Sequence, residues 1–151
     1  MKEIWILVAL LGTYGLAAAQ STNPKFNKKL ADSLGADEYG MKMYTMVILK
    51  TGPVKVEDKT VRDSIFRGHM NNIGRMAKMG KLVVAGPFES NDLNYRGIYI
   101  FNATLDETKE LVQTDPAVKA KILDPEIFQW YGSAALPLYL NVHETLWTKK
   151  P

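Results

Sequence analysis

The chain has 151 residues, 46% of them hydrophobic and 23% charged, which is the composition of a globular protein. Its formal net charge of +3 comes from 19 basic and 16 acidic residues, and no segment concentrates Lys and Arg as nucleic-acid-binding proteins do. Because cysteine is absent, the sequence excludes disulfides, thiolate metal sites and a cysteine nucleophile.

The first twenty residues have the pattern of a signal peptide. An apolar run from Ile4 to Leu11 follows a positive residue, and three alanines ending at Ala19 form a small-residue cleavage signature. The apolar part is shorter than the roughly 20 residues of a membrane span. We therefore predict cleavage after Ala19 or Gln20 and a periplasmic or secreted protein, with an uncleaved membrane anchor as the alternative. The roughly 130 residues that remain suffice for one domain.

The mature chain divides into three predicted parts. Residues 21–41 are polar without strong periodicity, and we interpret them as a linker in which residues 28–34 fit a short helix. Residues 42–132 form the predicted domain. Residues 133–151 form a C-terminal arm, which is too apolar for a disordered end and is expected to pack on the domain or on a second copy.

The domain begins with a strand and a long helix. Residues 43–50 are β-branched and apolar with hardly a break, a pattern typical of a buried central strand. Either Asp58 or Thr60 can cap a helix that continues to about Met79, and Gly80 suits the position just beyond its end.

A hairpin, two helices and a last strand follow. Apolar runs at residues 81–88 and 96–103, separated by a short polar loop, predict the hairpin. Residues 104–113 predict a helix capped by its first threonine, and residues 115–123 a short helix that begins at an Asp-Pro step. Residues 126–131 predict the fourth strand.

The order strand, helix, strand, strand, helix, strand predicts a ferredoxin-like α+β domain. Right-handed crossovers place both main helices on one face of an antiparallel sheet. The other face would then be bare and apolar, and large exposed apolar patches are rare on monomers. We therefore expect a second copy to cover that face in a homodimer.

His69 is the first candidate for chemistry. On the predicted long helix it falls within an apolar stripe: Val61, Ile65, Ile73, Met76 and Ala77. It therefore points at the sheet, either as a buried packing residue or as a general acid/base. A base needs an orienting carboxylate; Asp115 is the first candidate and Asp92 the second, while the alternative role of Asp115 is to cap the short helix.

The second histidine, His143, lies in the arm. It is four residues from both Tyr139 and Trp147, so a helix would place all three on one face, which favours a packing role. No ligand spacing joins it to His69 in a metal site. Since phosphate-binding glycine loops and a serine elbow are also missing from the sequence, we expect no cofactor.

Five residues are candidate substrate contacts: Phe88, Asp92, Arg96, Trp130 and His143. Phe88 and Trp130 offer apolar walls, and Arg96 can hold an anionic substituent. The alternatives are core positions for the two aromatic residues and solvated positions for the charged ones.

Three segments taken together resemble one family. They are the helix of His69 ending in M-x-x-I-x-R-M-A-K-M-G, the run K-L-V-V-A-G-P-F at residues 81–88, and T-D-P-A-V-K-A at residues 114–120. A strand ending in Trp130 follows. Over about residues 43–131 the chain resembles the YciI-like (YCII-related) family of small dimeric α+β barrel proteins.

This resemblance implies protomers that pair sheet to sheet and a His–Asp dyad in a cleft near the dimer interface. The histidine corresponds to His69 and the aspartate to Asp115, with Asp92 as the fallback. Most such proteins have no established reaction; a few similar ones are dehydrochlorinases of halogenated hydroxyquinones, and the wider superfamily includes lactone isomerases and monooxygenases. We thus expect a lyase or isomerase acting on a small cyclic or aromatic compound, with a non-catalytic ligand-binding or assembly module as the alternative.

Overall fold

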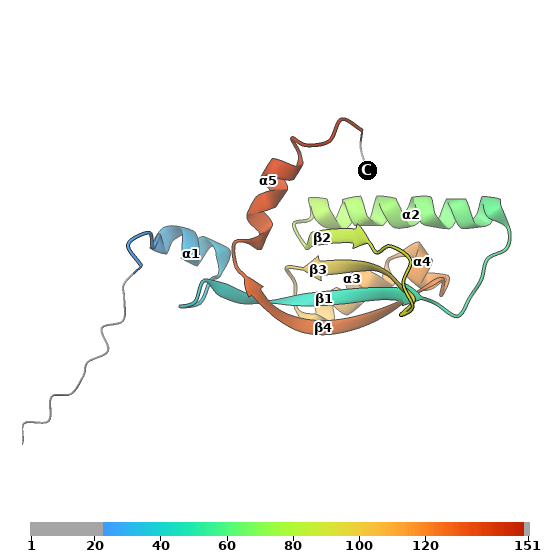
Figure 1. Cartoon of the computed structure of the whole chain (residues 1–151), viewed down its shortest axis with the longest axis horizontal. Helices are drawn as coiled ribbons and strands as arrows, with labels where there is room; N and C mark the ends of the chain where they lie inside the picture. The colour runs from blue at the N-terminus through green and yellow to red at the C-terminus, as the bar shows by residue number, and fades with distance from the viewer. Residues whose placement is uncertain (1–22, 150–151) are drawn as a thin grey trace, which may run out of the picture.

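A computed structural model describes residues 23–149 of the chain (Figure 1). The expected leader and its cleavage point lie outside the described residues. The centre of the domain is a four-stranded antiparallel sheet in the order β2-β3-β1-β4. Its strands are β1 (Met41–Thr51), β2 (Leu82–Pro87), β3 (Tyr95–Phe101) and β4 (Leu123–Ser133).

The helices of the domain cover one face of this sheet: α2 (Lys59–Lys78), α3 (Leu105–Gln113) and α4 (Pro116–Lys119). Figure 1 shows α3 and α4 behind the strands and α2 along the side of β2. β1 and β3 are the two central strands, and the chain order of the elements is βαββαβ. This is the ferredoxin-like α+β fold that the sequence predicts.

Most helix ends follow from capping residues. The Asp58 carboxylate accepts the Val61 N–H at 3.0 Å and begins α2, and Gly80 lies just beyond the helix with φ +68°. At the start of α3, the Thr104 hydroxyl accepts the Glu107 N–H at 3.3 Å. These ends agree with the predicted ones.

The short helix after Asp115 is the main departure from the predicted elements. It ends at Lys119 and not at residue 123. Lys121 takes the left-handed conformation with φ 56°, and the Ile122 N–H returns to the Ala117 carbonyl at 3.0 Å, which closes the helix. Leu123 is therefore free to start β4, which is longer than predicted because it pairs with β1 over its whole length.

The core lies between the helices and the inner face of the sheet. Alternate residues of β1 and β3 point inward and meet α2, α3 and α4. The buried cluster consists of Val47, Leu49, Met76, Leu82, Tyr99, Phe101, Leu111, Val112, Ala117, Val118 and Leu123. Ile65 and Ile73 of the predicted α2 stripe pack against it, whereas Val61 in the first turn is exposed.

The outer face of the sheet is apolar, as predicted. We call it the open face and define it by half-buried or exposed side chains that share this side through strand pairing: Met46, Ile48, Val84, Ile98, Phe128 and Trp130. No helix of the domain packs on it among the described residues.

Two short extensions flank the domain. Residues 28–34 form a helix, α1 (Lys28–Leu34), which starts at the Asn27 cap. The arm holds a 3₁₀ turn, η1 (Leu136–Leu138), and α5 (Tyr139–His143), which leads from β4 toward β2 (Figure 1).

The Tyr139 hydroxyl in α5 donates to the Val83 carbonyl and ties the arm to the edge strand β2. His143 lies against Tyr139, with ring centroids 6.3 Å apart, as predicted. The expected place of Trp147 on the same helical face is wrong, because the helix ends at His143. Within residues 23–149, no helix has the length and apolarity to cross a membrane.

Candidate functional site

α2 carries His69 into the interior of the domain. Only 9% of the residue is exposed, and its imidazole lies close to two aromatic rings. The Phe66 ring meets it edge-on at 5.9 Å, and the Tyr99 ring of β3 stacks at 6.3 Å. His69 therefore faces the sheet, as its position in the helical stripe predicts.

Asp115 is the carboxylate that meets His69. Its Oδ2 lies 2.7 Å from His69 Nδ1, and its Oδ1 accepts the Ala117 N–H at 2.8 Å. The residue is 1% exposed. Helix cap and histidine partner are alternatives at the level of sequence; in the structure, Asp115 performs both roles with one oxygen each.

This contact determines where the imidazole holds its proton. A carboxylate oxygen accepts and does not donate, so His69 Nδ1 is the protonated nitrogen in the neutral ring. His69 Nε2 then keeps the lone pair that can take up a proton. The arrangement is that of a histidine base oriented by an aspartate.

A close approach of two helices holds the pair together. Gly68 and Pro116 are the chain neighbours of His69 and Asp115, and they face each other where α2 meets α4. A Cβ atom at Gly68 would lie 2.9 Å from Pro116 Cγ. Only glycine allows α2 and α4 to come this close without a shift of either.

A polar network forms a second link between α2 and the segment before α4. Asn72 is buried one turn after His69, and its Oδ1 accepts from Arg75 Nη2 at 2.8 Å and lies 3.1 Å from Thr114 Oγ1. Arg75 Nη2 also donates to Thr114 Oγ1 at 2.7 Å. Because Thr114 directly precedes Asp115, this network fixes the start of α4 relative to α2.

The sequence-based search missed Asn72, Arg75, Thr114 and Gly68. The sequence does hold two signals: the side-chain amide of Asn72 on the inner side of α2, and Gly68 in the middle of that helix. Both residue types are unfavourable at such positions without a tertiary partner. Such a signal indicates that the residue makes a tertiary contact, but it does not identify the contacting residue.

The candidate substrate contacts lie apart from the dyad. Phe88, Asp92 and Arg96 are exposed in the hairpin between β2 and β3, where the Phe88 N–H donates to the Arg96 carbonyl at 3.0 Å. Trp130 lies on the open face against Tyr44 (centroids 5.8 Å apart), and His143 on the arm. Asp92 is thus not the carboxylate that meets His69.

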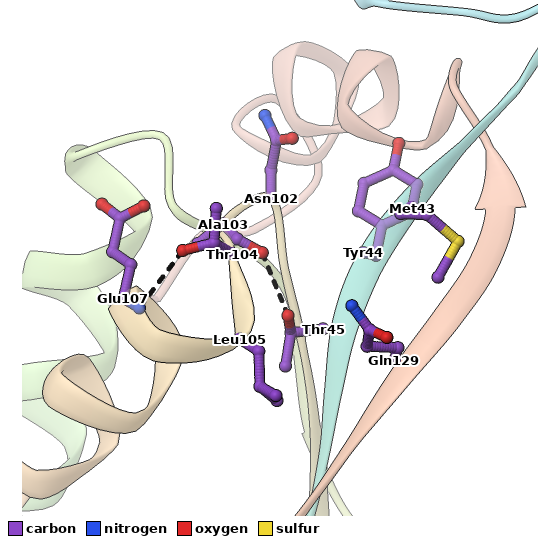
Figure 2. Close-up of a pocket in the computed structure, with 9 residues that line it drawn as sticks. All are labelled: Met43, Tyr44, Thr45, Asn102, Ala103, Thr104, Leu105, Glu107 and Gln129. Carbon is purple, nitrogen blue, oxygen red and sulfur yellow. Dashed lines mark hydrogen bonds between the residues drawn. The ribbon is translucent and has the colours of Figure 1, made fainter.

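Two hollows in the described part of the chain are relevant to the site. One, of about 400 Å³, lies at the start of α3 beside β1 and β4; Figure 2 shows the Thr45 hydroxyl donating to the Ala103 carbonyl within it. The other, of about 470 Å³, is a shallow depression on the outer side of α2 and includes Phe66. His69 lines neither hollow, but Phe66, which lines the second, contacts its imidazole.

Among residues 23–149, no three His, Asp or Glu side chains converge in a way that could hold a metal ion. Burial raises the pKa of the Tyr99 hydroxyl far above its usual value, and the negative charge of Asp115 raises it further. The hydroxyl beside His69 is therefore protonated throughout the physiological range.

Comparison with known proteins identifies the family. The model of the YCII-related domain matches residues 43–131, more than half of the chain. The chain belongs to the YCII-related family. Its match begins and ends with the paired strands β1 and β4, so that α1 and the arm of this YCII-related protein lie outside the family domain.

No curated protein matches the chain in sequence. One similar solved structure is 5-chloro-2-hydroxyhydroquinone dehydrochlorinase (TftG) from Burkholderia phenoliruptrix AC1100, in complex with 2,5-dihydroxybenzoquinone. It shares 22% identity at a TM-score of 0.43, over 58% of this chain and 92% of the other.

Proposed function

We propose that this YCII-related protein is a cofactor-independent enzyme of the lyase or isomerase type. His69 would take a proton from a small cyclic or aromatic compound, such as a phenol or lactone, and return it at another atom or to a leaving group. The observation that carries this proposal is the buried contact of 2.7 Å between His69 Nδ1 and Asp115 Oδ2.

The choice of partner supports a role beyond packing. A neutral buried histidine is satisfied by a backbone carbonyl, whereas a carboxylate in the interior costs several kcal/mol of desolvation. Asp115 is a useful partner when the ring becomes positively charged, because it stabilises the imidazolium. Buried titratable pairs of this kind are enriched at functional sites.

The test is turnover of a panel of phenols, halogenated hydroxyquinols and lactones by the purified protein. We expect His69→Gln to lower kcat by about 10²- to 10⁴-fold and Asp115→Asn to lower it by a similar order. Lys78→Gln changes an exposed residue on the same helix; it is the control and should keep full activity. Equal turnover by wild type and His69→Gln would refute the role of His69.

A second candidate is a non-catalytic dimeric module, in which His69 and Asp115 only stabilise the fold. It is favoured by the burial of His69, which lines neither of the two hollows described above. In that case no compound of the panel is turned over, and ligand binding, if present, does not change in His69→Gln.

We further infer a homodimer that pairs through the open face, and export of the mature protein to the periplasm or the exterior. The uncovered apolar side chains of the open face support the first inference, and the leader pattern supports the second. Because the dyad lies on the helix side of the sheet, the partner's sheet would stabilise the domain from the opposite side.

A further inference from the structure

Tyr99 is a polar group of the core that the sequence analysis did not single out. It points from the inner face of β3 toward α2 and is 2% exposed. Its ring is nearly parallel to the imidazole of His69, at an interplanar angle of 26°, and its hydroxyl lies 3.5 Å from His69 Nε2. This is the only ring nitrogen of His69 that Asp115 does not engage.

We propose that Tyr99 is a positioning residue of the dyad, whose hydroxyl hydrogen-bonds to His69 Nε2 and holds the imidazole with Nδ1 toward Asp115. The catalytic meaning of this role rests on the proposed function of His69. The hydrogen bond itself does not, and it is tested separately below.

The direction of the hydrogen bond follows from the proton on Nδ1. In the neutral ring Nε2 is an acceptor, so the Tyr99 hydroxyl donates to it. The hydroxyl keeps its proton, because burial keeps the pKa of Tyr99 well above its usual value. With Asp115 on one nitrogen and Tyr99 on the other, both edges of the ring have a polar partner.

The same hydroxyl also serves the charged ring. When a proton arrives on Nε2, the new N–H donates to the Tyr99 oxygen, and the phenol turns its own hydrogen away. In this step the bond between the proton and its donor, the substrate, breaks and the N–H bond to Nε2 forms, while Tyr99 neither gains nor loses a proton. A substrate that hands its proton to Nε2 must therefore first displace the Tyr99 hydroxyl.

The remaining surroundings of the imidazole leave this role to Tyr99. Phe66 contacts the ring with apolar atoms, and Asp115 engages Nδ1 and the Ala117 N–H. The Asp115 carboxylate also lies within hydrogen-bonding reach of the Tyr99 hydroxyl and is the second acceptor for its single hydrogen. A phenylalanine at position 99 would keep the stacked ring and remove only the hydroxyl, which makes Tyr99→Phe a selective change.

The test is the nitrogen spectrum of the two histidines in the ¹⁵N-labelled protein, at a pH where His69 is neutral. We expect wild-type Nε2 of His69 to resonate at the position of a hydrogen-bonded acceptor nitrogen, and Tyr99→Phe to move it to that of a free one. Nδ1 should stay protonated in both. His143→Gln assigns the signals.

Tyr44→Phe is the matched control. Tyr44 is equally buried but donates to the Ser133 carbonyl at 2.9 Å, so its loss should leave the His69 signals unchanged. An Nε2 resonance that is the same in wild type and Tyr99→Phe would overturn the proposal. If Tyr99→Phe does not fold, a wild-type Nε2 at the free position overturns it equally. Neither readout depends on turnover, so this result and the His69→Gln assay fail independently.

Discussion

The buried carboxylate of Asp115 depends on His69 for one of its hydrogen bonds. His69→Ala leaves a carboxylate in the interior without its histidine partner, with hydrogen bonds from the Ala117 N–H and the Tyr99 hydroxyl. We expect a loss of about 3 kcal/mol in the free energy of unfolding, measured by urea denaturation. Adding Asp115→Asn should recover part of the loss, because it removes the stranded charge. His143→Ala is the control on an exposed histidine and should change stability little.

Thr108 presents the opposite case, a buried hydroxyl that is not satisfied by a hydrogen bond among the described residues. It is fully buried on α3, and its Oγ1 has no hydrogen-bond partner among the described residues. Thr108→Val keeps the shape and removes the unsatisfied group, so we expect a gain of about 1 kcal/mol in stability.

Thr45→Val is the matched control for Thr108→Val. Thr45 is also buried, but its hydroxyl donates to the Ala103 carbonyl at 3.0 Å. The same replacement should therefore cost about 1 kcal/mol. Equal signs for the two variants would contradict the assignment of hydrogen-bonding partners.

At the scale of elements, the spacing between α2 and α4 depends on one glycine. Alanine is favoured over glycine inside a helix by about 1 kcal/mol, but at position 68 its Cβ would press against the ring of Pro116. We expect Gly68→Ala to push α4 outward, lengthen the contact between His69 and Asp115, and lower the melting temperature.

Gly74 lies on the same helix and provides the comparison. A Cβ there would meet nothing within 4 Å, so Gly74→Ala should raise the melting temperature through helix propensity alone. If Gly68→Ala stabilises the protein as much as Gly74→Ala does, then the two helices are not held at contact by this glycine.

Elements with local signals were predictable from the sequence. The α2 boundaries follow from Asp58 and Gly80, and β1 from its apolar run. The direction of His69 followed from helical periodicity. The end of α4 did not, because the left-handed turn at Lys121 is set by its contact with the loop after β1, where the Gly52 N–H donates to the Ile122 carbonyl.

The site was predictable only in part, for the same reason. The sequence offers His69 and a choice of carboxylates, but Asp115 becomes the partner through the packing of α2 on α4. The polar network joins Asn72 and Arg75 to Thr114, which lies about forty positions further along the chain. The spacing of these residues in the sequence does not predict this contact.

At the scale of the whole molecule, the open face is the feature that most needs a partner. Ile48 on the central strand β1 lies within it. We expect the wild-type protein to be a dimer in light scattering coupled to gel filtration, and Ile48→Glu to be a folded monomer, because the new charge would be buried at the interface.

Val61→Glu places the same charge on an exposed position of α2 and should leave the dimer intact. A wild-type monomer, or a dimer that survives Ile48→Glu, would refute pairing through the open face. In either case the exposed apolar side chains would need another explanation, such as a different partner for this surface.

The pairing of Met41 with Ser133 has a mechanical consequence. β1 and β4 are antiparallel neighbours, and the two extensions leave them at the same end of the sheet. A force that pulls the extensions apart therefore loads the β1–β4 hydrogen bonds one after another, in an unzipping geometry. It does not load them all together, as a shear geometry would. The domain should resist such tension weakly whatever its thermodynamic stability, and it would unravel from the strand pair that bounds the family domain.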